Sequence, residues 1–438
     1  MATWTCLTYL AARVAISAVL LAASGQLWAQ SLDQKAWNAV WDKLTSRLEN
    51  KSDYESVHVL KDLVAATWVE SNLESSTELL NLASALPEPI FSVAPSVMKD
   101  RLHDVYTRAV LDVDLPFENE GKRKAYQTAR NEFDAAFRAF QDRRKDYDDL
   151  WRKRREDLKA SNEKVNTRAY QRFVEENAGF FTKTRGDMED AMRKLHQFAP
   201  VSEVWASAVT RLRALTIDMK VATPGLFPYE GSQATLESIM EECKDDDPKG
   251  WETIVFDSSI NAQQNRSSKW NANGGWDGSF FKLNAGGGGG SYQSLISKAN
   301  EHVSLRFCNL RVITLRPGSW FEPSLLRAIH EGKLKLKNGS EFAGTPLLGP
   351  NGKVQRVVKG AIVARSVQFV ARLDESKLKE VKSSSGSSGG LSIGPFRIGG
   401  GKGGSEFSRE LKTASGEYGR STNSKVPVVL AIITEEVK

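Results

Sequence analysis

Cysteine and histidine are scarce in this chain, and their scarcity excludes the commonest structural metal sites. The 438 residues include three cysteines and five histidines. Cys6 falls in an N-terminal segment that we expect to be removed, which leaves Cys243 and Cys308. Two thiols cannot complete a four-ligand zinc site, and no histidine lies at metal-ligand spacing near them. In an exported chain the pair predicts one disulfide, with two separately buried thiols as the alternative.

Sequence motifs of the common enzyme classes are also missing. No Gly-x-Ser-x-Gly directly follows a predicted strand, and no His-Glu-x-x-His is present. A phosphate-binding loop needs Gly-Lys-Ser/Thr, whereas Lys402 is followed by Gly403 and Lys353 by Val354. The glycine runs contain no aspartate for calcium. We therefore predict no catalytic residue, cofactor or metal. An enzyme is the less favoured class, with a hydrolase lacking a recognisable motif as an alternative.

The charge is too small to indicate a nucleic-acid partner. The formal net charge is +6, and no basic stripe interleaved with aromatic residues accompanies it. Such a charge permits only weak attraction to anionic surfaces. The hydrophobic fraction of 40% and the eleven tryptophans are ample for packed cores, and the length predicts two or three domains.

Long hydrophobic runs are absent, but a short one lies at the N-terminus. Arg13 is the only charge before the apolar run 14–23, and the small residue Ala29 then precedes Gln30. This layout predicts a signal peptide over 1–29, because the run is too short to span a bilayer. We expect a secreted or periplasmic protein, with an uncleaved membrane anchor as the alternative.

Helical periodicity dominates the first half of the mature chain, and we predict an all-helical domain over 30–222. Apolar residues recur at three-four spacing in the segments 31–48, 54–69, 79–86 and 98–111. Pro224, Gly225 and Pro228 then interrupt the pattern and mark the predicted domain boundary.

Within this domain, an aromatic heptad predicts a long, coiled-coil-like helical hairpin over about 117–199. The heptad consists of Tyr126, Phe133, Phe140 and Tyr147, with Ala129, Ala136 and Leu150 at the companion positions. The expected partner segment, 163–198, presents Phe173, Phe180, Met188, Met192 and Leu195. An antiparallel hairpin within one chain is the favoured interpretation, and a homo-oligomer through these helices is the alternative.

The remaining chain, 223–438, predicts a mainly antiparallel β domain, so the fold class is α+β. Strands are expected at 251–256, 302–315, 361–373 and 426–434. Two inserts are rich in glycine and serine. One, about 261–300, lies between the first two of these strands, and the other, about 376–425, lies between the last two.

The two inserts resemble copies of one structural element. Aligning Phe281 with Phe396 places Leu283 on Ile398, and a glycine run ending in serine follows in both. Their apolar residues, with nearby tryptophans that we expect to be exposed, are candidate membrane or ligand contacts, although core packing is the alternative for each tryptophan. These candidates are Trp270, Trp276, Phe280, Phe281, Leu283, Trp320, Ile393, Phe396 and Ile398.

The composition of the inserts supports two hypotheses of function. The favoured one is an exported, non-enzymatic binding or interaction module carried on the helical domain, whose partner is a protein, a cell-surface polymer or a membrane surface. In composition, however, the inserts are similar to the insertion hairpins of secreted β-pore-forming toxins, and two per chain resemble the perforin-like arrangement. That resemblance implies a membrane-active protein. Against it, Lys282, Arg397, Lys402 and the glycine runs interrupt the apolar segments.

Overall fold

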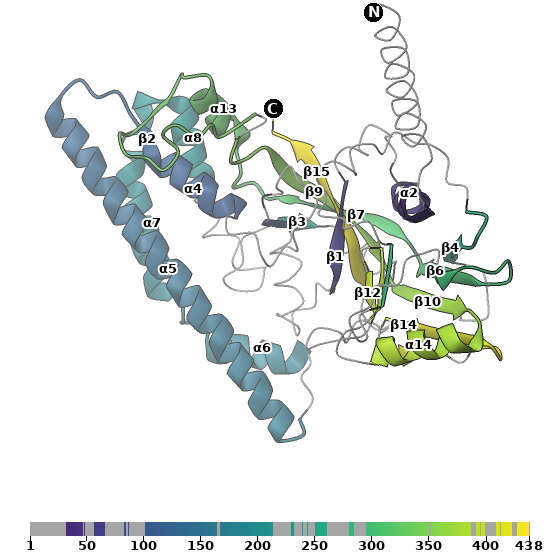
Figure 1. Ribbon diagram of the computed structural model, residues 1–438. Coiled ribbons are helices and arrows are strands. Elements are labelled where there is room, and N and C mark those ends of the chain that lie inside the picture. The colour runs from purple at the N-terminus through teal and green to yellow at the C-terminus, as the bar shows by residue number, and fades with distance from the viewer. Residues whose placement is uncertain are drawn as a thin grey trace, which may run out of the picture.

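A computed structural model shows a mixed α and β fold with antiparallel sheets (Figure 1). The structure describes residues 32–46, 57–65, 101–163, 167–212, 229–231, 250–260, 280–283, 295–349, 352–386, 391–394, 396–398, 409–411, 413–422 and 427–437, and isolated positions between them. The predicted signal peptide lies outside the described residues. The α+β class is confirmed.

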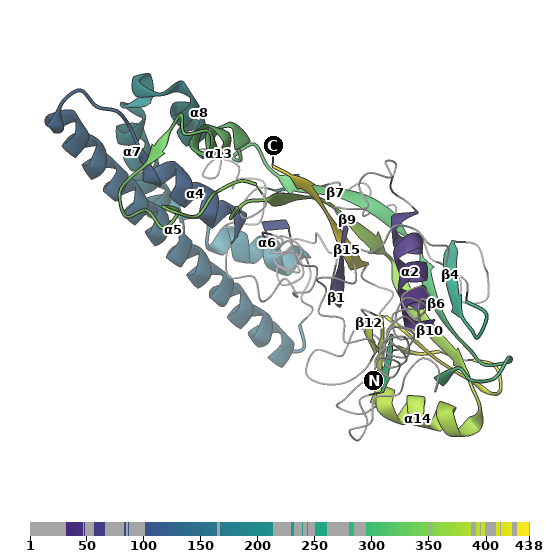
Figure 2. The ribbon, with the colours of Figure 1, turned by 45° about the horizontal axis from the view of Figure 1, so that its top comes forward.

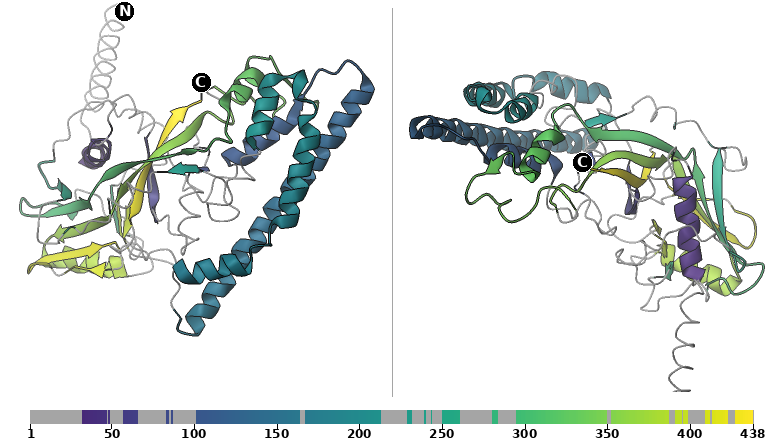
Figure 3. Two further views of the ribbon diagram at one scale, coloured as in Figure 1. Left: turned by 180° about the vertical axis from the view of Figure 1, so that it is seen from behind. Right: turned by 90° about the horizontal axis from the view of Figure 1, so that it is seen from above.

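Most of the helices gather on one side of the molecule and the sheets on the other, whereas α2 and α14 lie beside the sheets (Figure 3). The helices are α2 (Leu32–Thr45), α4 (Leu102–Asp112), α5 (Glu120–Ala160), α6 (Thr167–Glu176), α7 (Thr182–His196), α8 (Glu203–Leu212), α13 (Pro323–His330) and α14 (Glu375–Gly386), with the short η3 (Ala199–Val201).

Two five-stranded antiparallel sheets form the β part. One has the order β1-β15-β9-β7-β3 and the other the order β13-β14-β10-β6-β4. The strands are β1 (Val57–Ala65), β3 (Tyr229–Gly231), β4 (Trp251–Phe256), β6 (His302–Cys308), β7 (Arg311–Pro317), β9 (Arg356–Ala364), β10 (Ser366–Arg372), β13 (Arg409–Glu410), β14 (Glu417–Ser421) and β15 (Val428–Glu436). The ladder β2 (Val113–Asp114) with β8 (Lys335–Leu336) and the small sheet of β5 (Phe281–Leu283), β11 (Leu391–Ile393) and β12 (Phe396–Ile398) complete the described strands.

Two of the predicted strands pass from one large sheet to the other, which corrects their expected continuity. The strands predicted at 302–315 and 361–373 are each divided in two. Asn309, whose φ is 47°, separates β6 from β7, and Arg365 separates β9 from β10. Both breaks lie at the same level, because Arg365 N donates to Cys308 O at 2.9 Å. A bend there lets a single strand serve two sheets, and alternating hydrophobicity alone does not reveal it.

The helix predicted at 54–69 is wrong, because this segment contains strand β1. Val57 and Val59 pair with Ile433 and Ala431 of β15, and β1 therefore forms an edge of the first sheet. Two of the four residues that suggested a helical face, Val57 and Val64, are β-branched, and β-branched side chains also suit a strand. Pairing with a strand from the other end of the chain decided between the two structures, so the expected all-helical domain contributes a strand to the sheet.

Acidification is expected to weaken this edge through His58. His58 Nε2 lies 3.0 Å from Thr434 Oγ1, and burial, together with the charge of Arg356, lowers the pKa of His58 from 6.5 to about 4. The unfolded chain therefore binds more protons than the folded chain between these values. The free energy of unfolding should fall by about 2–3 kcal/mol as the pH drops from 7 to 4.5. Urea unfolding of the wild type and His58→Gln at both pH values measures the effect, and an equal pH dependence in the two proteins would contradict it.

Helix α5 packs lengthwise against the segment that follows it. Going up α5, Tyr126 contacts Phe198, Phe140 contacts Phe181, and Tyr147 contacts Phe173. The partner residue numbers decrease as those of α5 increase, so α5 runs antiparallel to the segment that contains α6 and α7, as a long arm beside the β part (Figure 2).

One companion position of the heptad is wrong. Leu150 is 41% exposed, whereas its neighbour Trp151 is 1% exposed and packs against Tyr170 and Phe173. An α-helix has 3.6 residues per turn and drifts relative to a seven-residue repeat. Towards its C-terminal end, the buried stripe of this straight helix therefore moves from the i+3 to the i+4 position.

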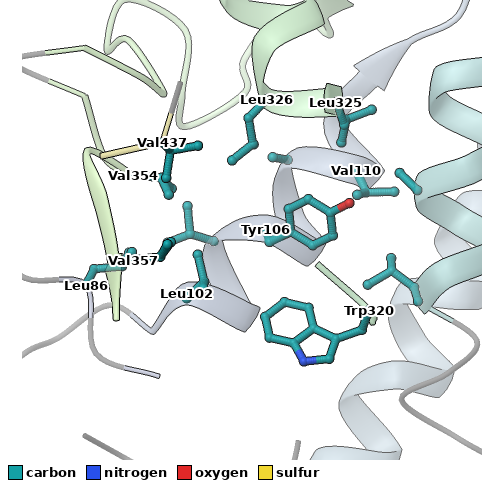
Figure 4. Packing of buried hydrophobic residues seen from close by; sticks show 14 of the residues in the cluster. Leu86, Leu102, Tyr106, Val110, Trp320, Leu325, Leu326, Val354, Val357 and Val437 are labelled. Atoms are coloured by element: carbon teal, nitrogen blue, oxygen red, sulfur yellow. The ribbon is translucent and has the colours of Figure 1, made fainter. Parts of the chain in front are cut away.

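A continuous hydrophobic core joins the helices to the first sheet across the predicted boundary near residue 222. Tyr106 of α4 lies between Trp320 and the α13 residues Leu325 and Leu326 (Figure 4). The same core includes Val105, Tyr126, Phe133, Met188 and Trp205 from the helices and Ile313, Val357, Ala361 and Ile432 from the strands. Helices α4, α7, α8 and α13 and the first part of α5 are therefore packed onto this sheet in one core.

Candidate functional site

The candidate site consists of two inserts that leave the second large sheet from one end. Strands β4, β6, β10 and β14 are consecutive neighbours in this sheet. His302, the first residue of β6, pairs with Arg372, the last residue of β10, and Arg372 pairs with Glu417 at the start of β14. Phe256, the last residue of β4, pairs with Val303 at the same end. We define insert 1 as the segment 257–301 between β4 and β6, and insert 2 as the segment 373–416 between β10 and β14.

The two inserts meet in one small antiparallel sheet, which we call the insert sheet. Its order is β12-β11-β5, with β5 from insert 1 and the other two strands from insert 2. Ile393 of β11 pairs with Phe281 on one side and Phe396 on the other, and Leu391 pairs in the same way with Leu283 and Ile398. The two copies inferred from the sequence therefore occupy equivalent positions on either side of β11.

The rows of the insert sheet alternate in character. Phe281, Ile393 and Phe396 form one row, and Leu283, Leu391 and Ile398 form another. Between them lies the row Lys282, Ser392 and Arg397. Since successive residues of a strand alternate between its faces, the sequence gives this sheet an apolar and a polar face. Lys282 and Arg397 thus belong to the polar row with Ser392, and they do not break the alternation of the strands.

The insert sheet is packed against the second large sheet and helix α2. Phe280, Phe281, Ile393 and Phe396 are at most 1% exposed. The ring of Phe280 lies 4.9 Å from that of Phe256 in β4, and the ring of Phe396 lies 6.0 Å from that of Phe307 in β6, measured between centroids. In Figure 1, β12 and α14 lie beside β10 and β14. In the folded chain these four apolar side chains are therefore stored in the core.

Two polar contacts hold the ends of β5 and β11. The buried carboxylate of Asp33 in α2 accepts a hydrogen bond from Phe280 N at 2.6 Å. Gly394 N donates to Phe280 O at 2.6 Å. The φ of Gly394 is +54°, and a Cβ atom there would lie 2.7 Å from Cε2 of Phe280, so this turn requires glycine.

A cluster of ion pairs joins the two inserts beside the second large sheet, which we call the main sheet. Lys377 Nζ in α14 lies 3.0 and 2.8 Å from the two carboxylate oxygens of Glu301, which is 2% exposed. Lys298 Nζ lies 3.2 Å from Asp374 Oδ2. Burial opposes ionisation of Glu301. The hydrogen bonds from Lys377 and from the backbone of Lys298 and Ser297 outweigh it and lower the pKa of that carboxyl. The pKa of Asp374 is lowered first by the backbone N–H of Lys377 and then by Ser376.

Glu301→Gln is expected to lower the free energy of unfolding by about 2–3 kcal/mol, because it removes the closer of the two carboxylates beside the Lys377 ammonium, the other being Asp374 at 4.0 Å. Because the folded pKa of Glu301 is lowered, this contribution is present above the ordinary pKa of 4.5 and is lost as the pH falls through the folded value. Urea unfolding at pH 7 measures the loss. Lys298→Gln is the matched control, since it removes an exposed pair between the same inserts and should have a much smaller effect. Equal effects of the two variants would refute the assigned importance of Glu301.

The predicted site residues fall into three groups. Phe280, Phe281, Ile393 and Phe396 come together, and Leu283 and Ile398 join them by strand register. Trp320 does not belong to the site, because it is fully buried in the other core against Tyr106. The expectation that its ring is exposed is wrong, since helix packing covers it. Trp270 and Trp276 lie outside the described residues.

The predicted disulfide between Cys243 and Cys308 is present, with the two Cα atoms 6.0 Å apart. It ties the end of β6 to the segment before β4, at the end of the second sheet opposite the inserts.

Sequence reasoning missed Asp33, Glu301 and Lys377. Asp33 lies 247 residues from Phe280 in the chain, and Lys377 lies 76 residues from Glu301. Single acidic and basic residues on helices or in loops normally face solvent, so no local pattern distinguishes Asp33 and Lys377 on helices or Glu301 before β6.

No family model matches this chain, and no curated protein or solved structure matches it. The site must be interpreted from its own geometry. Within the part of the chain that the structure describes, no helix has the length and apolar character needed to cross a membrane. Among the same residues, no group of three or more His, Cys, Asp and Glu side chains could hold a metal ion.

Proposed function

We propose that this chain is a membrane-inserting protein of the β-pore-forming type, in which the two inserts lengthen strands β4, β6, β10 and β14 into a lipid bilayer. The observation that carries the proposal is the consecutive order of these strands, with two inserts of nearly equal length at one end. Each insert joins two strands that are already antiparallel neighbours. Straightening an insert therefore extends an existing hairpin.

The inserts are long enough for this role. Half of either insert is about 22 residues, or roughly 70 Å when extended at about 3.3 Å per residue. A strand that crosses a bilayer needs about 9–11 residues. Each arm can thus cross the hydrocarbon region and still leave a stem above it.

The distribution of apolar residues agrees with insertion. The segments 280–283 and 391–398 lie near the middle of their inserts, so they would lead each hairpin into the bilayer. The rows of the insert sheet alternate between apolar and polar residues, as a strand between lipid and water requires. Six of the nine residues that the sequence identified as candidate membrane or ligand contacts fall in these two segments.

Two hairpins from one chain would still leave unpaired strand edges, which lipid does not tolerate. The proposal therefore requires several copies of this chain, with their strands joined edge to edge into a closed ring. β4 is one edge strand of the sheet, and on the other side β13 covers β14. The partner of the protein is accordingly a second copy of itself at a membrane surface.

Release of size-graded dyes from liposomes tests the proposal, using the mature chain from Gln30 onward together with sedimentation of the lipid. A pore should release small dyes and retain large dextrans, and the bound protein should form oligomers. Release of all sizes at one rate would indicate detergent-like lysis and contradict the proposal. Neither release nor co-sedimentation would also contradict it, and would leave the exported binding module as the function to pursue.

A further inference from the structure

The insert sheet has the register that the main sheet would impose on it. In the main sheet, His302 of β6 pairs with Arg372 of β10. Phe281 precedes His302 by the same number of positions as Ile393 follows Arg372. Phe281 and Ile393 are partners in the insert sheet. If the residues between the two sheets were straightened, β5 and β11 would already be correctly paired.

The second ladder gives the same result. Arg372 of β10 pairs with Glu417 of β14 in the main sheet. Phe396 precedes Glu417 by the same number of positions as Ile393 follows Arg372. Ile393 and Phe396 are partners in the insert sheet. The strand order also agrees, because β5-β11-β12 corresponds to β6-β10-β14.

Equal spacing underlies this agreement. Three stretches of identical length, which we call the connecting stretches, join the strands of the insert sheet to β6, β10 and β14; they are 284–301, 373–390 and 399–416. A change of one residue in any of them would shift a register and turn the apolar row to the opposite face. Folding of the stored form does not demand equal lengths, since 375–386 forms helix α14 while 295–300 forms turns.

We infer that β5, β11 and β12 are the preformed far end of the extended sheet, and that the inserts straighten without exchanging strand partners there. This inference rests on the proposed function. Pairing between β5 and β11 would then keep the ends of the two hairpins aligned while the connecting stretches change conformation. The loop-closure entropy of bringing the two inserts together is then already lost before insertion begins.

Strands β13 and β14 must separate for insert 2 to straighten. β13 lies on the outer edge of β14, where Glu410 pairs with Arg420. In a straightened insert 2, Glu410 would follow the line of β14 beyond Glu417 and could not reach Arg420. The two ladders of the insert sheet therefore persist, whereas the ladder between β13 and β14 breaks.

Two double-cysteine variants distinguish these ladders. Lys282→Cys with Ser392→Cys links β5 to β11 in the insert sheet, and Glu410→Cys with Arg420→Cys links β13 to β14. Directly opposite residues of antiparallel strands lie within disulfide reach. Dye release from liposomes is measured for each variant oxidised and then reduced. Wild type with and without reductant controls for the native Cys243–Cys308 bond.

The oxidised Lys282/Ser392 variant is expected to release dye within about twofold of its reduced form. The oxidised Glu410/Arg420 variant should release at least tenfold less than its reduced form. If the Lys282/Ser392 link blocks release and reductant restores it, the inference is wrong although the proposed function stands. If the Glu410/Arg420 link has no effect, insert 2 does not straighten and the inference is equally wrong. If the reduced proteins and the wild type release nothing, the proposed function fails and the inference with it.

Discussion

Replacing Phe281 with alanine should destabilise the packed inserts by about 3–5 kcal/mol, one of the two largest single-residue effects that we expect in this protein. Phe281 is 1% exposed, and its ring contacts those of Phe256 and Phe280, which come from β4 and from the residue before β5. Alanine removes most of the buried side chain and leaves a cavity between the insert sheet and the main sheet. Urea unfolding measures the loss of stability, and hydrogen exchange of 280–283 and 391–398 locates it.

Val255→Ala is the matched control for this prediction. Val255 lies in β4 next to Phe256, but its side chain is 47% exposed, so its truncation should change stability by less than about 0.5 kcal/mol. A similar loss in both variants would mean that the apolar residues of the inserts are not stored in the core. If Phe281→Ala accelerates exchange only in the inserts, their packing is separable from the folding of the body, as release into a membrane requires.

The second large effect is expected in the helical hairpin. Trp151→Ala should cost about 3–5 kcal/mol, because Trp151 is 1% exposed and packs against Tyr170 and Phe173 of α6. Leu150→Ala, one position away and 41% exposed, should cost less than about 1 kcal/mol. Thermal unfolding followed by circular dichroism compares the two. A larger loss of stability in Leu150→Ala than in Trp151→Ala would contradict this prediction and would place Leu150 in the buried stripe.

The sequence determined those parts of this protein that depend on local periodicity. The aromatic spacing from Tyr126 to Tyr147 located the long helix α5 and favoured its packing against the following segment, because a helix brings residues three, four and seven apart onto one face. Runs of β-branched and other apolar residues likewise located strands β4 and β15, and the α+β class followed from the two patterns together.

The aligned segments around Phe281 and Phe396 were also visible in the sequence. Their equivalence did not depend on knowing that both strands flank β11. What the sequence could not supply was β11 as their common partner, since the short alternation Leu391-Ser392-Ile393 does not say which strands it pairs with.

Only the tertiary structure decided the features that join distant segments. β1 became a strand because β15 offers it an edge, and the two long strands bend where Arg365 meets Cys308. Trp320 is buried because helices of the first half of the chain cover it. Pairing, burial and register between remote segments depend on contacts between distant parts of the chain, which local spacing does not encode. The apolar and glycine-rich composition of the inserts could therefore be recognised in the sequence. That both inserts leave the same end of the main sheet, and that they pair in one register, was shown only by the fold.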